Sequence, residues 1–315
     1  MKKYPLFLSP VIRSAIWGGN SLVDRWGMKS CADNAAEAWM LSVRKNEMSK
    51  ITNGEAEGMT LDEYFDLVGY DSIRPDFVKD DTFPLLIKFI DARADLSVQV
   101  HPDDAYAKRV ENDLGKTEMW YVVEASQGAE IVYGIAEGVD GTEFQKAVDT
   151  GELGHVMNRV KVKAGDCYFI PSGMLHAIGG GILIAEIQQN SDLTYRVYDY
   201  DRVDKNGNKR ELHKDKAKDV TRVFSDEEID GLRYERGRTE GILASSRYFK
   251  AYKITGEGEL DPDDSFISLL CINGEGYIEH ETQKYPIKKG DSVYLPCKMG
   301  RCRVYGGAEI ICSEI

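Results

Sequence analysis

Two stretches of the sequence contain side chains of the types that bind metal ions. In the first, residues 96–101 read LSVQVH, and apolar residues alternate with Gln99 and His101. Successive side chains of a strand point to opposite faces, so this period places Gln99 and His101 on one face. A proline and two aspartates then end the strand and begin a short helix. The chain is predicted to return as a second strand, on which Lys116 and Glu118 share a face.

The second stretch, residues 165–176, contributes another histidine. It reads GDCYFIPSGMLH, which predicts a tight turn, a short apolar strand and a further turn that presents His176. Both stretches together supply two imidazoles, a carboxylate and an amide, which suit zinc and equally iron, manganese, cobalt or nickel. A single strand histidine is more often a hydrogen-bonded structural residue. The combined spacing, Q-x-H-x16-E and then G-x5-P-x-G-x2-H, favours a metal site.

This spacing resembles the two metal-binding motifs of cupin β-barrels. The strings LSVQVHPDD, GKTEMWYV, IPSGMLHAI and SDLTYRVYDYDR further resemble signature blocks of type I phosphomannose isomerases in their short bacterial form. Similar blocks run from residues 16–19 to residues 210–213, about two thirds of the chain. The resemblance implies a cupin enzyme that interconverts mannose 6-phosphate and fructose 6-phosphate through an enediol. It also implies one divalent metal per chain, with zinc as the first candidate.

The resemblance assigns roles to individual residues. It implies four metal ligands: Gln99, His101, Glu118 and His176. It places an active-site arginine at Arg196, where a fixed positive charge would lie beside the enediolate, and an active-site lysine at Lys116. Lys116 and Glu186 are both candidates for the proton transfer, and the sequence does not choose between them. Ser97 and Arg202 are candidate substrate-binding residues.

Composition limits the partners. The 315 residues are 42% hydrophobic and 30% charged, as in ordinary globular proteins, and the formal charge of −13 disfavours nucleic acid or an anionic membrane. A sugar phosphate would therefore need a local basic pocket. No run of residues approaches the ~20 apolar residues of a membrane span, and no signal-peptide pattern is convincing. The six cysteines form no C-x2-C pair. We therefore expect a cytoplasmic monomer or homodimer with free thiols.

Short strands separated by turns predict a mainly β fold, a double barrel (bicupin) with a few short helices. Thr60 and Glu63 form a capping-box pattern at the start of one helix. We expect strands over residues 38–43 and 83–90, helices over residues 61–67 and from Thr142 to Gly151, and a linker with one short helix over residues 215–232.

An internal repeat supports the double barrel. Residues 161–176 align with residues 286–301 at a constant offset of 125, so that Gly-Asp matches Gly-Asp and proline matches proline. Arg301 stands where the first copy has His176. We therefore predict an N-terminal barrel with the metal site and short helical insertions over residues 1–235. A degenerate barrel without metal would occupy residues 236–315, with strands of the N-terminal segment as candidates for its sheet. His280 is expected to be a surface strand residue.

Two other functions remain open from the sequence. A non-haem iron cupin dioxygenase also uses two histidines and a carboxylate, but the fourth ligand Gln99 and the nearby cations disfavour it. A non-catalytic sugar-binding cupin would keep the barrel without the chemistry. The presence of Lys116 and Arg196 weighs against this second alternative.

Overall fold

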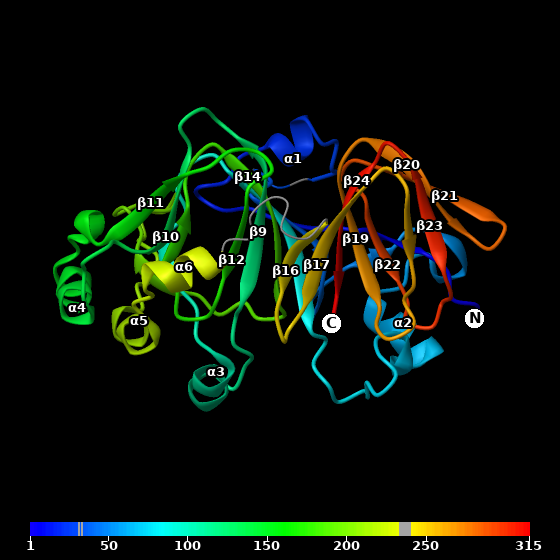
Figure 1. Ribbon diagram of the computed structural model, residues 1–315, viewed down its shortest axis with the longest axis horizontal. Helices are drawn as coiled ribbons and strands as arrows, with labels where there is room; N and C mark the ends of the chain where they lie inside the picture. Colours follow the sequence, from blue (N-terminus) through cyan, green and yellow to red (C-terminus); the bar gives the residue numbers. More distant parts are fainter. Residues whose placement is uncertain (31, 33, 233–240) are drawn as a thin grey trace.

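Antiparallel strands form the framework of the molecule. A computed structural model describes residues 1–30, 32, 34–232 and 241–315. Four large sheets form two units that lie side by side, each a pair of facing sheets (Figure 1). The predicted mainly β, two-unit architecture is confirmed. In the described part of the chain, the two sheets of each unit are separate in their hydrogen bonding rather than closed into one cylinder.

The N-terminal unit pairs a six-stranded sheet with a five-stranded one. The six-stranded sheet has the order β12-β9-β14-β7-β3-β2, with bounds β2 Val11–Arg13, β3 Glu37–Leu41, β7 Leu85–Ala92, β9 Glu118–Ala125, β12 Cys167–Ile170 and β14 Ile182–Gln189. The five-stranded sheet has the order β11-β10-β13-β8-β15, with bounds β8 Val98–Val100, β10 Glu130–Ile135, β11 Met157–Lys161, β13 His176–Ile178 and β15 Tyr195–Tyr198.

The C-terminal unit pairs a seven-stranded sheet with a four-stranded one. The first has the order β16-β17-β24-β19-β22-β1-β6, with bounds β1 Leu6–Ser9, β6 Lys50–Ile51, β16 Ile242–Ser245, β17 Lys250–Thr255, β19 Ile267–Asn273, β22 Ser292–Leu295 and β24 Glu309–Glu314. The second has the order β18-β23-β20-β21, with bounds β18 Gly258–Leu260, β20 Glu275–His280, β21 Gln283–Lys288 and β23 Cys302–Gly306. Strands β4 (Val43–Arg44) and β5 (Glu47–Met48) form a small hairpin.

The N-terminal segment contributes to the C-terminal unit. Strands β1 and β6 lie in the seven-stranded sheet, and the N-terminus lies beside that unit (Figure 1). The division into residues 1–235 and 236–315 stays a prediction, because its boundary falls in residues 233–240, outside the described residues.

Helices are short and lie around the sheets. Their bounds are α1 Ser21–Asp24, α2 Leu61–Val68, α3 Asp104–Val110, α4 Gly141–Thr150, α5 Lys214–Val220 and α6 Asp226–Leu232, with 3-10 turns η1 Gly54–Ala56, η2 Tyr70–Ser72 and η3 Leu153–His155. The predicted capping box at Thr60 is confirmed: its hydroxyl accepts from the Glu63 N–H, and the Glu63 carboxylate accepts from the Thr60 N–H. None of the helices in the described ranges is both long and apolar enough to cross a bilayer.

Three local expectations are corrected by the structure. Helix α4 begins at Gly141 and is capped by the Asp140 carboxylate, so the predicted start at Thr142 is wrong, whereas its end at Gly151, with φ 79°, is confirmed. The region expected to hold one short helix contains two, α5 and α6. His280 is 5% exposed, not a surface residue, because its ring packs inward and its Nε2 contacts the Met299 carbonyl oxygen at 3.2 Å.

The internal repeat corresponds to one turn built twice. Gly165 and Gly290 have φ of 88° and 91°, a left-handed conformation that glycine adopts without strain. The carboxylates of Asp166 and Asp291 each accept from the backbone N–H three residues earlier, at 2.9 and 2.8 Å. The following strands, β12 and β22, keep the offset of 125 at both ends. The two copies of the repeat thus have the same local structure, because they have the same residues at the same spacing.

Layered packing leaves one polar region inside the N-terminal unit. One apolar cluster fills the space between the six- and seven-stranded sheets, and another fills the C-terminal unit. A third covers the outer face of the five-stranded sheet beneath α4 and α5. Between the two N-terminal sheets, the inner residues are apolar at one end, where Trp120 and Tyr133 lie. Towards the other end, the strands turn charged side chains inward, and this end holds the candidate site.

Candidate metal centre and active-site cleft

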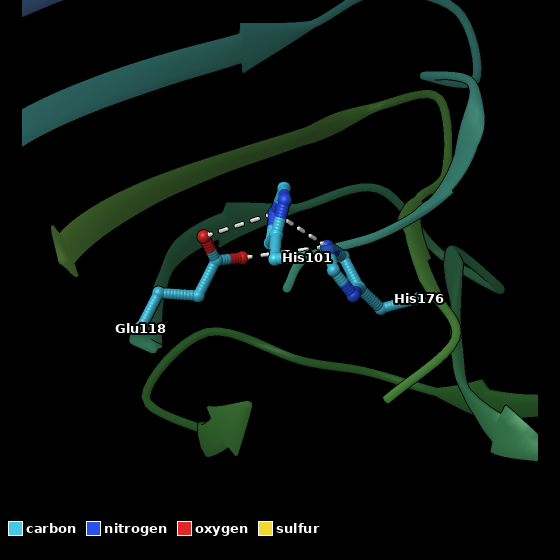
Figure 2. Close-up of side chains that lie close together, drawn as sticks. All are labelled: His101, Glu118 and His176. Carbon is cyan, nitrogen blue, oxygen red and sulfur yellow. Dashed lines mark hydrogen bonds and ion pairs between the residues drawn. The ribbon is translucent and has the colours of Figure 1, made fainter. Parts of the chain in front are cut away.

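Three buried side chains converge from three separate positions in the sequence. His101 follows β8, Glu118 begins β9 and His176 begins β13. His101 Nε2 lies 3.1 Å from His176 Nε2 and 3.4 Å from a Glu118 oxygen, and His176 Nε2 lies 3.6 Å from the other oxygen (Figure 2). All three side chains are at most 1% exposed. They form the one cluster of potential metal ligands among the residues that the structure describes.

Charge and protonation in this cluster favour a cation. Burial lowers the pKa of His101 to about 3, and it also lowers the pKa of His176. Burial alone would raise the pKa of Glu118, but Lys116 and the two imidazoles hold it well below its usual range. The cluster at neutral pH is therefore one carboxylate facing two neutral rings.

The donor atoms of this cluster fit a divalent metal. His176 Nδ1 lies 2.8 Å from the Met174 carbonyl oxygen, so Nδ1 carries the proton and Nε2 presents its lone pair. Both Glu118 oxygens are buried; Lys116 Nζ lies 3.1 Å from one, and the other has no hydrogen-bond partner in the described part of the chain. An unpartnered buried carboxylate oxygen is costly, and a cation held by the three residues would satisfy it. Two imidazoles and one carboxylate are a common ligand set for zinc.

Gln99, the expected fourth ligand, lies next to the cluster. It is paired directly with His176 on β13 and with Arg196 on β15. Directly opposed residues of antiparallel strands point to the same face, so all three side chains point between the two sheets. Gln99 is partly buried and lines the adjacent cleft.

A polar cleft of about 310 Å³ opens beside the cluster. It is lined by Ser97 and Gln99, by the cations Arg13, Lys88, Lys116, Arg196 and Arg210, and by the carboxylates Glu37, Glu186 and Asp192. The basic pocket that an acidic protein needs for an anionic ligand is thus present. Lys116 connects the cleft to the metal cluster, because its Nζ lies 3.1 Å from a Glu118 oxygen.

A buried ion pair, Glu186 and Lys88, lines this cleft. Glu186 on β14 is paired in register with Trp120 on β9 and Lys88 on β7. One carboxylate oxygen of Glu186 accepts from the Trp120 indole at 2.9 Å, and the other lies 3.4 Å from Lys88 Nζ. Burial raises the pKa of Glu186, and repulsion from Glu118 adds to this shift.

Lys88 was missed by the sequence analysis. It is 4% exposed and lies 3.7 Å from Glu37, its second carboxylate neighbour. The sequence predicts a strand over residues 83–90, FPLLIKFI, without a role for Lys88. The single charged residue in that run was the available signal, because a buried lysine requires a charged partner.

Arg196 and Arg202 differ in their surroundings. Arg196 lines the cleft, where its Nη1 donates to the Glu211 carbonyl oxygen at 3.1 Å and its buried Nε has no hydrogen-bond partner among the described residues. Burial lowers its pKa, and the neighbouring Arg210 lowers it further. Arg202 does not line the cleft. It donates to the Asp199 carboxylate and to the Asp95 carbonyl oxygen.

Arg210, which the sequence analysis did not nominate, does line the cleft. Its guanidinium makes two hydrogen bonds to the Asp199 carboxylate, with Nε at 2.7 Å. This bidentate pair fixes the orientation of Arg210. Its place in the block at residues 210–213 was the available signal.

Comparisons with known proteins identify the family of this chain. The model for "phosphomannose isomerase type I, catalytic domain" matches residues 6–137, and that for "mannose-6-phosphate isomerase, cupin domain" matches residues 242–315. The chain is 40% identical to a mannose-6-phosphate isomerase of Bacillus subtilis, with both chains covered completely. It is 39% identical to one from Streptococcus mutans, with 98% of each chain covered.

Solved structures show the same fold. The crystal structure of the mannose 6-phosphate isomerase from Bacillus subtilis matches with a TM-score of 0.88 at 38% identity, over 99% of both chains. A mutant phosphomannose isomerase from Salmonella typhimurium matches with a TM-score of 0.81 over 98% of this chain and 99% of that one. At 14% identity, it supports the fold alone. On these matches along its whole length, the chain belongs to the type I phosphomannose isomerases.

Proposed function

We propose that this chain is a mannose-6-phosphate isomerase, which interconverts mannose 6-phosphate and fructose 6-phosphate. The observation that carries the proposal is the buried group of His101, Glu118 and His176 beside a cleft lined by cations. Full-length relatives named for this activity support it. They favour it over the iron dioxygenase and the sugar-binding cupin that the sequence left open.

We propose His101, Glu118, His176 and Gln99 as the ligands of one divalent metal per chain, with zinc as the first candidate. When bound, such a cation supplies a Lewis acid that stabilises negative charge on a substrate oxygen. The other steps fall to side chains of the cleft.

Glu186 is our candidate for the base that moves a proton between carbons. It would take the proton from C2 of the open-chain aldose and return it to C1, which leaves the ketose. Support comes from its raised pKa and its place on the floor of the cleft, because a base works best when its pKa lies near the working pH. Lys88, 3.4 Å away, would hold the carboxylate in place.

Lys116 and Arg196 would act on the substrate oxygens. As the sugar passes through the enediol, a proton must also move from O2 to O1, and the Lys116 ammonium is placed beside the metal cluster to donate to these oxygens. Arg196 brings a guanidinium that has no carboxylate partner among the described residues, so its charge is available to a developing enediolate. Such fixed charges often supply the largest part of catalysis.

The phosphate would be held at the cation-lined part of the cleft. Ser97, nominated from the sequence, and Arg210 both line it, whereas Arg202 does not. We therefore propose Ser97 and Arg210 as phosphate ligands in place of Arg202. Arg210 suits this role because its pairing with Asp199 fixes the guanidinium before the substrate arrives.

The free cysteines support a cytoplasmic location, which we include in the proposal. Cys271, Cys297, Cys302 and Cys312 are buried and unpaired, and Cys167 is partly buried and unpaired. Unpaired cysteines of this kind are typical of reducing compartments.

A coupled assay for fructose 6-phosphate, run with and without a chelator, tests the function. We expect metal-dependent turnover of mannose 6-phosphate and a much lower kcat/KM for free mannose, because the phosphate positions C1 and C2. Equal kcat/KM for the two sugars would refute the phosphate site. Oxygen consumption that depends on added iron would instead support the dioxygenase.

A further inference from the structure

A hydrogen-bond network at Asp104 links the two units of the molecule. Asp104 begins α3, three residues after His101. Its Oδ1 accepts from the Gly115 N–H and from Gln189 Nε2, both at 3.0 Å. Its Oδ2 accepts from the Tyr248 hydroxyl at 2.7 Å, and Tyr248 belongs to the C-terminal unit.

The same network reaches the strand that carries Glu118. The side chain of Gln189 is buried, and its Oε1 accepts from the Thr117 N–H at 2.8 Å. Thr117 stands between Lys116 and Glu118. The Lys116 N–H donates to the Pro102 carbonyl oxygen at 3.0 Å. The segment between His101 and Glu118 is therefore closed at its base. Asp104, near its His101 end, bonds to Gly115 near its Glu118 end and, through Gln189, to Thr117.

Gly115 allows this close approach. A Cβ atom at position 115 would lie 2.5 Å from the Asp104 backbone nitrogen, a distance that side chains essentially never show. The start of α3 and the residue before Lys116 are thus in direct backbone contact.

Tyr248 is held firmly on the other side of the network. It lies in the turn between β16 and β17, where the Ser246 hydroxyl accepts from the N–H groups of Tyr248 and Phe249, both at 3.2 Å. Its ring packs against the core between the two units. In Figure 1 the β16–β17 hairpin lies between the units, and α3 lies beneath the N-terminal one.

The proposed metal ligands need this kind of support. His176 is oriented by the Met174 carbonyl oxygen. By contrast, His101 Nδ1 has no hydrogen-bond partner in the residues that the structure describes, and outside the cluster Glu118 is paired with Lys116, whose Nζ lies 3.1 Å from one of its oxygens. Because Lys116 belongs to the same segment, the placement of both ligands depends on the backbone of the segment that Asp104 closes.

We propose that Asp104 is a positioning residue for the metal site, and that Tyr248 extends its support from the C-terminal unit. The degenerate C-terminal unit would thus contribute to the site without contributing a ligand. This inference rests on the metal site of the proposed function, not on the identity of the sugar.

Zinc affinity of purified variants, measured by competition with a chromophoric chelator, tests the proposal. Asp104→Ala should weaken zinc binding by about tenfold, the low end of the range for residues that orient ligands indirectly. Tyr248→Phe, which removes one oxygen atom, should weaken it less. The double variant should be no weaker than Asp104→Ala, because the hydroxyl acts through that carboxylate. Asp104→Asn keeps an acceptor and should recover part of the affinity.

Tyr285→Phe provides a matched control. It removes a hydroxyl that donates to Gln283 at 2.6 Å on the far hairpin and should leave zinc affinity unchanged. Wild-type zinc affinity in Asp104→Ala, even with a lowered melting temperature, would show a merely structural role and overturn the proposal. So would a Tyr248→Phe effect that is undiminished in the Asp104→Ala background. A wild-type protein that binds zinc but does not isomerise mannose 6-phosphate would refute only the proposed function.

Discussion

His101 Nε2 and His176 Nε2 lie 3.1 Å apart, although 75 residues separate them in the sequence. Burial keeps both rings neutral, so the two nitrogens face each other across a space that also contains the Glu118 carboxylate.

Replacing His101 or His176 with Ala should empty the metal site. Each substitution removes one of the few protein ligands, and the remaining donors cannot complete the coordination of the metal. Elemental analysis of the purified variants should show metal content falling from one ion per chain towards zero, with activity falling in proportion. His155→Ala, an exposed histidine beside Glu143, is the control and should keep its metal. Two tightly held metals per wild-type chain would contradict the single site.

The metal-free protein should lose stability as pH falls from 7 to 5. The pKa of His101 is lowered from 6.5 to about 3 in the folded state, and that of His176 is lowered too. The unfolded chain therefore binds protons below about pH 6.5 that the folded chain cannot, and the free energy of unfolding falls with pH in this window. The lowered pKa of Glu118 adds a loss only below its ordinary value of 4.5.

Melting temperatures of metal-free variants test this pH dependence. His101→Gln should show a smaller decrease between pH 7 and pH 5 than the wild type, and His155→Gln should match the wild type. Glu186 has a raised pKa and contributes with the opposite sign, but it does so equally in all three proteins. Identical slopes in the wild type and His101→Gln would mean that the buried imidazole is not the source.

Glu186→Gln should lower kcat by a factor on the order of 10²–10⁴, the usual contribution of a positioned base. Metal content should stay at the wild-type level, because Glu186 is not among the proposed ligands. The exposed Glu143→Gln is the control. A Glu186→Gln enzyme with normal kcat would instead direct attention to Lys116 as the proton-transfer group.

Arg196→Ala should lower kcat far more than it raises KM, since a charge beside the enediolate acts mainly in the transition state. A single electrostatic donor of this kind is typically worth a factor on the order of 10²–10³. Arg196→Lys should recover only part, because an ammonium lacks the planar fork of donors. Arg109→Ala, on the exposed side of α3, is the control. An increase in KM alone would assign Arg196 to phosphate binding rather than to catalysis.

Local structure was largely predictable from the sequence, because short-range rules decide it. The capping box at Thr60 and the end of α4 at Gly151 are encoded within a few residues. The repeated Gly-Asp turn also revealed the duplication, since equal residues at equal spacing form equal turns. The predicted start of α4 was wrong because two residues could cap this helix. The Asp140 carboxylate, and not the Thr142 hydroxyl, accepts from the free N–H groups at the start of the helix.

The sequence also determined the chemical types at the site, while the tertiary structure decided which of them meet. The alternation of side chains along a strand places Gln99 on the same face as His101. The spacing of the two motifs identified His101, Glu118 and His176 as candidate metal ligands. Only the pairing of β14 with β7 brings Glu186 to Lys88, because cross-strand register is set by long-range packing and not by neighbours in the chain. The same holds for Arg210 lining the cleft in place of Arg202, and for Tyr248 reaching Asp104 from the other unit. Such contacts depend on how sheets pack against each other, and no local pattern records that packing.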